Sequence, residues 1–164
     1  MASHNDSTII SITTPSQLSS SFKTYQQLRP HLVNEQEFIQ QILSQQSNEG
    51  FKLSGISSPM QEDSTSEIST STNNESQIFI ALVGFRIMTT TAWGKIVYID
   101  DLITSEEYRG CGHGSKLLNH VFDYARENGC KQVHLDSGYQ RNAAHKVYLN
   151  HGFTLASHHF SKVL

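Results

Sequence analysis

The sequence predicts an α/β sandwich in which a mixed, mostly antiparallel sheet is flanked by helices. Two observations support this fold class: short apolar segments of strand length alternate with amphipathic segments of helix length, and the apolar periodicity changes from two to about 3.6 between them. The 164 residues suit a single domain, which we expect to span residues 1–164. The expected order of elements is β-α-α-β-β-β-α-β-α-β.

The first third predicts one strand and two helices. Residues 7–13 contain three isoleucines among Ser and Thr, which is typical of a strand. Thr14 and Pro15 predict a helix start, because Thr caps well and Pro suits the first helical position. Asn34 and Glu37 form a capping-box-like pair that predicts the start of the second helix.

The middle third predicts three strands and a long polar loop. Residues 51–56 alternate between apolar and polar side chains, as a half-buried strand does. Residues 78–88 are almost wholly apolar, which predicts a central strand covered on both faces, and residues 96–104 return as its hairpin partner. Residues 57–77 are rich in Ser, Thr and Asn and predict a solvated loop, and residues 1–6 a frayed tail.

The last third predicts a helix, a strand, a short helix and a final strand. The first of these helices ends at Gly129 and has an apolar stripe consisting of Leu117, Leu118, Val121, Phe122 and Ala125. Val133 and Leu135 alternate with polar neighbours in the next strand. Asn142 is expected to cap the short helix, and residues 153–163 to form a final strand or hairpin.

Composition excludes several classes of protein. Hydrophobic residues make up 37% of the chain and charged residues 16%, with a net charge of −3, which argues against nucleic-acid binding. No apolar run approaches the roughly 20 residues of a membrane helix, and no export signal is visible, so we expect an intracellular, cytoplasmic location. Cys111 and Cys130 flank a predicted helix and are expected to be reduced thiols.

The most informative segment is a glycine-rich turn that follows a strand and opens the best helix. The first N–H groups of a helix lack partners within the helix, and the dipole there is positive, so glycines at this point favour an anion site. The spacing fits neither a P-loop nor a dinucleotide-binding fingerprint. The turn consists of Arg109, Gly110, Cys111, Gly112, His113, Gly114 and Ser115.

Within this turn the pattern Arg-x-x-Gly-x-Gly resembles the pyrophosphate-binding signature of the GNAT superfamily of acetyl-CoA-dependent N-acetyltransferases. The surroundings agree with the resemblance, because the family has an apolar strand before the signature and a further strand and short helix after it. The resemblance is specific over residues 78–164. The downstream family positions are matched in order by Asn142, Tyr148, Gly152 and Phe153.

The resemblance implies where the cosubstrate acetyl-CoA would bind. In relatives the pantetheine arm pairs with backbone at positions that match Leu102, Ile103 and Thr104, and the pyrophosphate sits on the N–H groups of the turn. Asn142 would help to hold the cofactor, and Tyr148 would face the thioester sulfur. No metal or prosthetic group is implied, and the spacing of the histidines does not predict a metal site.

Acetyl transfer needs an acid for the departing thiolate. The phenol of Tyr148 still carries its proton at neutral pH, which suits the general-acid role. The alternative is that Tyr148 only belongs to the core stripe of its helix, together with Ala144 and Val147.

The attacking amine needs a base, and here several candidates remain open. Asp100 is the first candidate, as base or ammonium anchor, and Asp101 is the second. Adjacent strand residues point to opposite faces, so only one of them reaches the cleft unless a bulge intervenes. His134, Asp136 and an ordered water are further candidates.

The resemblance therefore implies an N-acetyltransferase that moves acetyl from acetyl-CoA to a primary amine of a small molecule or protein by direct attack in a ternary complex. The alternative is a catalytically inactive acyl-CoA-binding sensor or scaffold. The expected partner is an amine-bearing acceptor, with no nucleic acid and no membrane. Since dimers are common among relatives, a homodimer is compatible with the sequence.

Overall fold

Five strands form one mixed sheet in the computed structural model, which describes residues 8–59 and 77–164. The strand order is β1-β2-β3-β4-β5; the first four strands are antiparallel, and β4 and β5 are parallel. The elements are β1 (Ile9–Ser11), α1 (Pro15–Leu28), α2 (Glu35–Asn48), β2 (Lys52–Pro59), β3 (Gln77–Thr90), β4 (Gly94–Thr104), a 3₁₀ turn (Glu106–Tyr108), α3 (His113–Glu127), β5 (Gln132–Leu135) and α4 (Asn142–Asn150).

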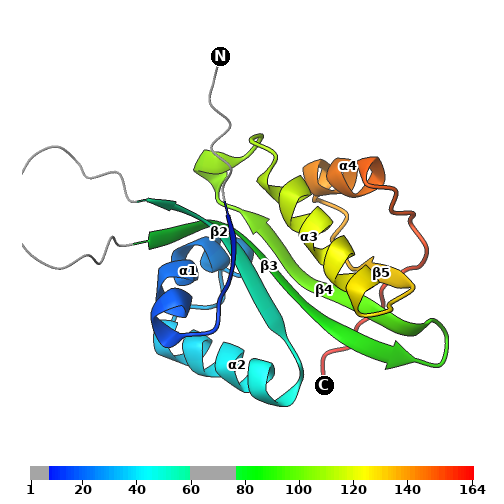
Figure 1. Ribbon diagram of the computed structural model, residues 1–164, viewed down its shortest axis with the longest axis horizontal. Helices are drawn as coiled ribbons and strands as arrows, with labels where there is room; N and C mark the ends of the chain where they lie inside the picture. The colour runs from blue at the N-terminus through cyan, green and yellow to red at the C-terminus, as the bar shows by residue number, and fades with distance from the viewer. Residues whose placement is uncertain (1–7, 60–76) are drawn as a thin grey trace, which may run out of the picture.

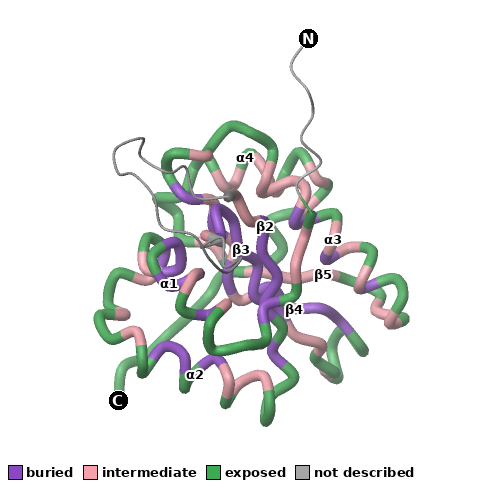
Figure 2. The backbone as a smooth tube through the Cα atoms, turned by 60° about the vertical axis from the view of Figure 1, so that its left-hand side comes forward, coloured by how far each residue is buried: buried purple, intermediate pink, exposed green. Residues whose placement is uncertain are grey.

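The sheet is covered on both faces, which confirms the predicted α/β class (Figure 1). Helices α1 and α2 pack on one face through an apolar cluster that includes Leu18, Phe38 and Phe79. Helix α3 packs on the other face through a second cluster that includes Val83, Leu117 and Val121. Burial is concentrated along β2, β3 and β4, at the centre of the molecule (Figure 2).

The starts of α1 and α2 are as the sequence predicts. The hydroxyl of Thr14 accepts a hydrogen bond from the backbone of Gln17, whose side chain accepts one in return. The side chain of Asn34 accepts from the backbone N–H groups of Gln36 and Glu37, so it caps α2. These contacts are local, which is why the sequence alone identifies them.

Two irregularities in β4 shape the region that follows. Strand β4 pairs with β5 only over Ile96–Ile99, so the two parallel strands share no ladder beyond that point. On the other side β4 has a bulge: Gly84 lies opposite Asp101 and Phe85 opposite Ile99, which leaves Asp100 as the extra residue.

Two local expectations are wrong. Residues 153–164 form no strand: they make no ladder with the sheet, although β5 at its edge has a free side, and Leu155, Phe160 and Val163 are at least 85% exposed. Asn142 is the first residue of α4 and not its cap; Arg141 holds the cap position and makes no side-chain capping bond.

The remaining expectations concern the two cysteines, the polar loop and the N-terminal tail. Both cysteines are free thiols, as predicted. Most of the predicted loop 57–77 and the predicted tail 1–6 lie outside the described residues, although β2 continues to residue 59 and β3 begins at residue 77.

Candidate active site

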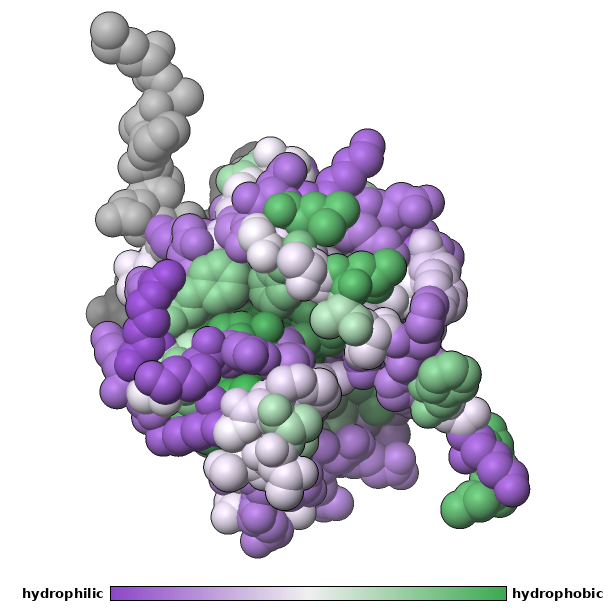
Figure 3. Space-filling model, turned by 90° about the vertical axis from the view of Figure 1, so that its right-hand side faces the viewer, coloured by the Kyte–Doolittle hydropathy of each residue, from purple (hydrophilic) through white to green (hydrophobic). Residues whose placement is uncertain are grey.

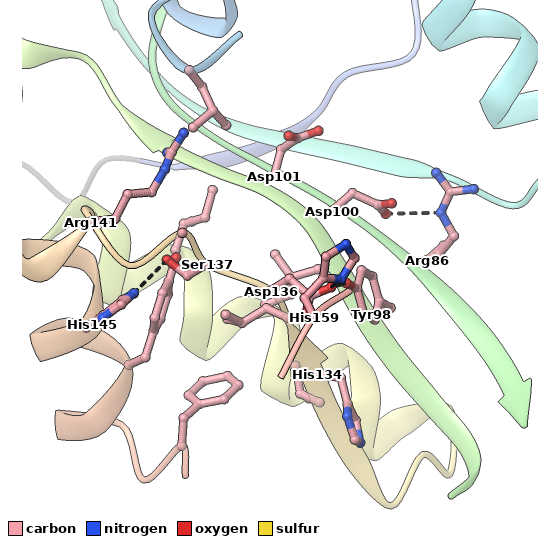
Figure 4. Close-up of a pocket in the computed structure, with 18 of the residues that line it drawn as sticks. Arg86, Tyr98, Asp100, Asp101, His134, Asp136, Ser137, Arg141, His145 and His159 are labelled. Carbon is pink, nitrogen blue, oxygen red and sulfur yellow. Dashed lines mark hydrogen bonds and ion pairs between the residues drawn. The ribbon is translucent and has the colours of Figure 1, made fainter. Parts of the chain in front are cut away.

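A groove opens where β4 and β5 part. Its lining comes from the C-terminal part of α1, from α2 and α3, from β3, β4 and β5, from α4 and from the segment after α4. Figure 3 shows that the face on this side of the molecule is hollowed, with hydrophobic atoms in its floor and hydrophilic atoms around its rim. Figure 4 shows the polar residues that project into the groove from β4, β5 and α4.

The bulge brings two neighbouring carboxylates to the same face of β4. Oδ2 of Asp100 accepts a hydrogen bond of 3.0 Å from Nε of Arg86 (Figure 4), whose guanidinium lies over the ring of Phe51 in the core below α1 and α2. Asp101 reaches α1 on the same face. Both side chains therefore line the groove, which only the bulge allows.

Asp101 is fully engaged by α1. Its Oδ1 accepts from Nε and Nη2 of Arg29 at 2.9 and 2.6 Å, and its Oδ2 accepts from the hydroxyl of the buried Tyr25. This carboxylate is only 10% exposed. Because both of its oxygens are engaged, by Arg29 and by the buried Tyr25, Asp101 is poorly placed to take a proton from a substrate.

Asp100 has the more open environment. Burial raises the pKa of its carboxyl above the ordinary value, while the hydrogen bond and charge of Arg86 act in the opposite direction. Arg86 is itself shared with Glu49 at the end of α2, at 2.6 Å, so it does not neutralise Asp100 alone. A partly buried carboxylate of raised pKa suits a base.

A second polar cluster lies on the same face, beyond Asp100. Tyr98 donates a hydrogen bond of 2.5 Å to Asp136, whose carboxylate also lies 3.1 Å from His159 of the C-terminal segment (Figure 4). His134 stacks on Trp93 with ring centroids 4.5 Å apart. The structure thus brings Asp136 and His134 to the groove. Oδ2 of Asp136 is contacted by both Tyr98 and His159.

Tyr148 lines the groove from α4. Its ring is half-buried and packs against Phe153, and its hydroxyl makes no hydrogen bond to any residue that the structure describes. Burial raises the pKa of the phenol above its ordinary value, and the charge of Arg141 opposes this effect. The phenol is therefore protonated at neutral pH and has a free hydroxyl at the groove.

The glycine-rich turn lies just past the end of β4. Gly110 and Gly112 have φ angles of 79° and 82°, a conformation that favours glycine. The first hydrogen bond of α3 runs from the N–H of Lys116 to the carbonyl of Gly112, so the N–H groups of residues 113–115 precede it. Nε of Arg109 donates to the carbonyl of Thr104 at 3.3 Å, which ties the turn to β4.

Gly114 differs from Gly110 and Gly112, because its backbone conformation does not favour glycine. Its φ lies outside the left-handed region, and a Cβ built at this position would meet only Oγ1 of Thr104, at an ordinary 3.9 Å. Neither backbone strain nor protein packing requires a glycine there, although glycine weakens a helix. The space beside Gly114 is open, next to the N–H groups of the first turn of α3.

The structure does not bring all predicted positions to one place. Leu102 lines the groove, whereas the side chain of Ile103 is buried in the core, so Ile103 can offer only its backbone. The turn 109–115 and the exposed Asn142 lie outside the groove lining. Cys111 is exposed within the turn.

Sequence reasoning missed four side chains of the groove. Arg86 had a signal, because it is the one charged residue within the apolar stretch 78–88. Tyr25 and Arg29 had no such signal, because Tyr25 lies on the ordinary apolar stripe of a helix and Arg29 directly follows that helix. Tyr98 alternates with Asp100 on β4, and this period-two relation was the signal that could have found it.

Residues 38–153 match the model of the acetyltransferase (GNAT) family. Among curated proteins, the chain is 41% identical over 70 residues to the uncharacterized N-acetyltransferase YhdJ of Bacillus subtilis, covering 42% of this chain and 49% of that one. It is 36% identical over 53 residues to bovine thialysine N-epsilon-acetyltransferase (32% and 31% covered) and 31% identical over 85 residues to streptothricin acetyltransferase of Streptomyces lavendulae (48% and 45% covered). The matches thus span half or less of these relatives.

Solved structures agree in fold. An acetyltransferase of Trypanosoma brucei superposes with a TM-score of 0.73 at 18% identity, covering 96% of this chain and 99% of that one. The ribosomal-protein-alanine N-acetyltransferase of Brucella melitensis superposes with a TM-score of 0.67 at 13% identity, covering 96% and 98%.

Two kinds of feature are absent from the described part of the chain. Among residues 8–59 and 77–164, no group of three or more His, Cys, Asp or Glu side chains is arranged to hold a metal ion. Within the same ranges, no helix combines the length and the apolar character needed to cross a membrane.

Proposed function

The chain belongs to the acetyltransferase (GNAT) family, and on that basis we propose that it transfers an acetyl group from acetyl-CoA to a primary amine of a small molecule or protein. The observation that supports this most is the space beside Gly114. A glycine that neither the backbone nor the packing needs, next to the helix N–H groups that precede the first helical bond, suits the close approach of a ligand phosphate.

Acetyl-CoA would lie along β4. Its pyrophosphate would accept hydrogen bonds from the N–H groups of residues 113–115 in the glycine-rich turn, with Arg109 and Asn142 near it. Its pantetheine arm would run beside the backbone of Leu102, Ile103 and Thr104, where β4 no longer pairs with β5. Main-chain groups on that edge have no strand partner, so they can pair with an extended amide-bearing chain.

The transfer would proceed by direct attack. The amine nitrogen attacks the thioester carbon, the C–S bond breaks, and an amide forms. The proton lost by the amine goes to the carboxylate of Asp100, and the departing thiolate takes the proton of the Tyr148 hydroxyl. The environments of the two groups suit these roles, since one carboxyl is a stronger base than usual and one phenol keeps its proton.

Asp100 is the preferred base among the candidates. Asp101 is buried and held by Arg29 and Tyr25, and Asp136 is shared between Tyr98 and His159. Both oxygens of Asp101 are already hydrogen-bonded, so Asp101 would have to break a hydrogen bond to accept a proton, whereas Asp136 is contacted at Oδ2 alone. The carboxylate of Asp100 is also contacted by a side chain through one oxygen, Oδ2, and it is preferred to Asp136 because burial raises its pKa.

A cationic amine fits the groove. Asp100 and Asp136 both line it, and the aromatic rings of Trp93 and Tyr98 lie on the same side. Two relatives are named as acetyltransferases of thialysine and of streptothricin, and small-molecule amines of that kind are a reasonable first panel.

The test combines binding and turnover. Calorimetry with coenzyme A is expected to show one binding event, and thiol release from acetyl-CoA is expected to rise with at least one amine of a broad panel. Mass detection of the acetylated product identifies the acceptor. Binding of coenzyme A without turnover on any small amine or protein amine would show an acyl-CoA-binding module instead, and no binding at all would overturn the proposal.

A further inference from the structure

Helix α1 ends against the bulge of β4, and the contact is made by Arg29. This residue is the C-cap of α1, where its backbone N–H bonds to the carbonyl of Tyr25, and Pro30 follows it. Proline cannot continue the helix, so the chain turns away and leaves the Arg29 side chain directed at β4.

One guanidinium holds both aspartates at the bulge. Nε and Nη2 of Arg29 donate to Oδ1 of Asp101 at 2.9 and 2.6 Å. Nη2 also donates to the backbone carbonyl of Asp100 at 3.2 Å. Arg29 therefore contacts the side chain of one aspartate and the main chain of the other.

The main-chain contact matters because of where Asp100 lies in the ladder. As the extra residue of the bulge, Asp100 has no partner of its own on β3, and β5 has already separated from β4. The residue has lost the cross-strand restraints that fix an ordinary strand residue. Arg29 supplies a restraint in their place, and the direction of the Asp100 carboxylate follows from the orientation of its backbone.

We propose that Arg29 is a positioning residue for acetyl transfer: it fixes the β4 bulge so that Asp100 faces the groove, and it compensates the neighbouring charge of Asp101. This inference rests on the proposed function. Arg29 itself need not touch the acetyl group or the amine. Its effect is exerted through Asp100 and depends on one planar cation that donates in two directions at once.

The electrostatic part of the proposal follows from the groups around Asp100. Asp101 raises the pKa of the Asp100 carboxyl through its charge, and without Arg29 this effect would act uncompensated. The titratable and charged groups that line this region come from every element around it: Tyr25, Arg29 and His31 in and after α1, Glu49 after α2, Arg86 from β3, Tyr98 and Asp101 from β4, His134 and Asp136 in and after β5, Arg141, His145 and Tyr148 at and in α4, and His159 from the C-terminal segment.

The experiment compares Arg29→Gln with the parent in kcat/KM for an accepted amine, followed across pH. We expect kcat/KM to fall about 10- to 100-fold, as for a misplaced reacting group. We also expect its acidic limb to move to higher pH, with the affinity for coenzyme A unchanged. Lys23→Gln removes a cation from the exposed side of the same helix and is expected to behave as the parent does.

Two further variants separate charge from geometry. Arg29→Lys keeps the positive charge but loses the planar guanidinium that donates in two directions. The acidic limb of the kcat/KM profile is therefore expected to lie at the same pH as in the parent, while kcat/KM itself stays low. The double variant Arg29→Gln with Asp101→Asn leaves no unpaired buried charge, so it is expected to fold. Its acidic limb should lie near that of the parent, and its kcat/KM should be low.

The outcomes that overturn the proposal are distinct from those that overturn the function. An active parent whose rate and pH profile are matched by Arg29→Gln, or a double variant with the full parent rate, shows that Arg29 has no positioning role. A parent with no turnover on any amine overturns the proposed function, and the role of Arg29 with it.

Discussion

The ring of Tyr148 packs edge-on against Phe153, with centroids 5.8 Å apart and an interplanar angle of 63°. The contact is made by the aromatic ring of Tyr148. The hydroxyl has no hydrogen-bond partner among the described residues. The structural and the catalytic interpretations of Tyr148 therefore involve different atoms and can be tested separately.

Replacement of Tyr148 by Phe is expected to lower kcat by about 100-fold or more, the usual contribution of a general acid. The ring contact remains, so the melting temperature and the dissociation constant of coenzyme A should stay close to those of the parent. Tyr124→Phe removes a hydroxyl from a ring that packs on Phe85 and is expected to keep full activity. Equal kcat values for the Tyr148→Phe variant and the parent across pH would exclude the acid role.

Gly114→Ala should separate stability from binding. Alanine stabilises a helix relative to glycine by roughly 0.5–1 kcal/mol, and the added methyl meets only Thr104 at 3.9 Å, so the free energy of unfolding should not fall. The methyl fills the space proposed for the pyrophosphate, so calorimetry should show at least about tenfold weaker binding of coenzyme A.

Gly50→Ala is the matched control for this prediction. Gly50 has a φ of 67° and an empty neighbourhood, so alanine there should cost about 1–2 kcal/mol of stability and leave binding unchanged. If Gly114→Ala binds coenzyme A as the parent does, the pyrophosphate does not lie at the start of α3.

Asp100→Asn should abolish most of the turnover and the acidic limb of the pH profile. In the parent, the base form of Asp100 is lost as pH falls through a pKa that burial has raised, so kcat/KM should decline at a higher pH than for an ordinary carboxyl. The amide cannot accept a proton, and a loss of about 100-fold or more is expected. Asp123→Asn, on the exposed face of α3, should keep the parent profile. A parent-like acidic limb in Asp100→Asn would assign the base to another group.

His120 should make stability depend on pH. Its Nε2 lies 3.3 Å from Oγ of Ser54, and burial lowers its pKa below the ordinary value of 6.5. The unfolded chain therefore binds this proton more readily, so the stability contributed by the neutral ring is present above pH 6.5 and lost as pH falls through the lower, folded-state pKa.

Urea unfolding at about pH 7.5 and about pH 5.5 measures this effect. The loss of stability between the two conditions should be smaller in His120→Gln than in the parent. His31→Gln, which replaces an exposed histidine, should retain the loss seen in the parent. An unchanged loss in His120→Gln would show that other groups cause it.

The parts of this molecule that the sequence predicts are those set by neighbours in the chain. The caps at Thr14 and Asn34 and the strand composition around β3 are local signals, and they place the sheet and the first two helices. The Arg109 to Ser115 turn is also local. Its chemistry follows from the residue types alone, because helix N–H groups and glycines act through the backbone.

The parts that could not be predicted depend on contacts between distant segments. The bulge at Asp100 lies opposite Gly84 on β3, where a Cβ would meet the Phe51 ring at 2.5 Å, and it is contacted by Arg29, about 70 residues away in sequence. The predicted strand at residues 153–163 is wrong for a related reason: a strand needs a ladder with a distant segment, and none forms here although β5 has a free edge.

The short ladder between β4 and β5 has a consequence for the motion of the protein. Strand β5 joins the sheet along one side only, over four residue pairs, and the chain from α4 onward adds no strand to the sheet but packs on Phe122 of α3 through His151 and Phe153. Amide protons of the C-terminal quarter should therefore exchange with deuterium through a partial opening that leaves the rest protected. The proposed pantetheine arm beside β4, where β5 has separated, would bridge the two strands and slow that exchange, so binding could be followed in residues that never touch the cosubstrate.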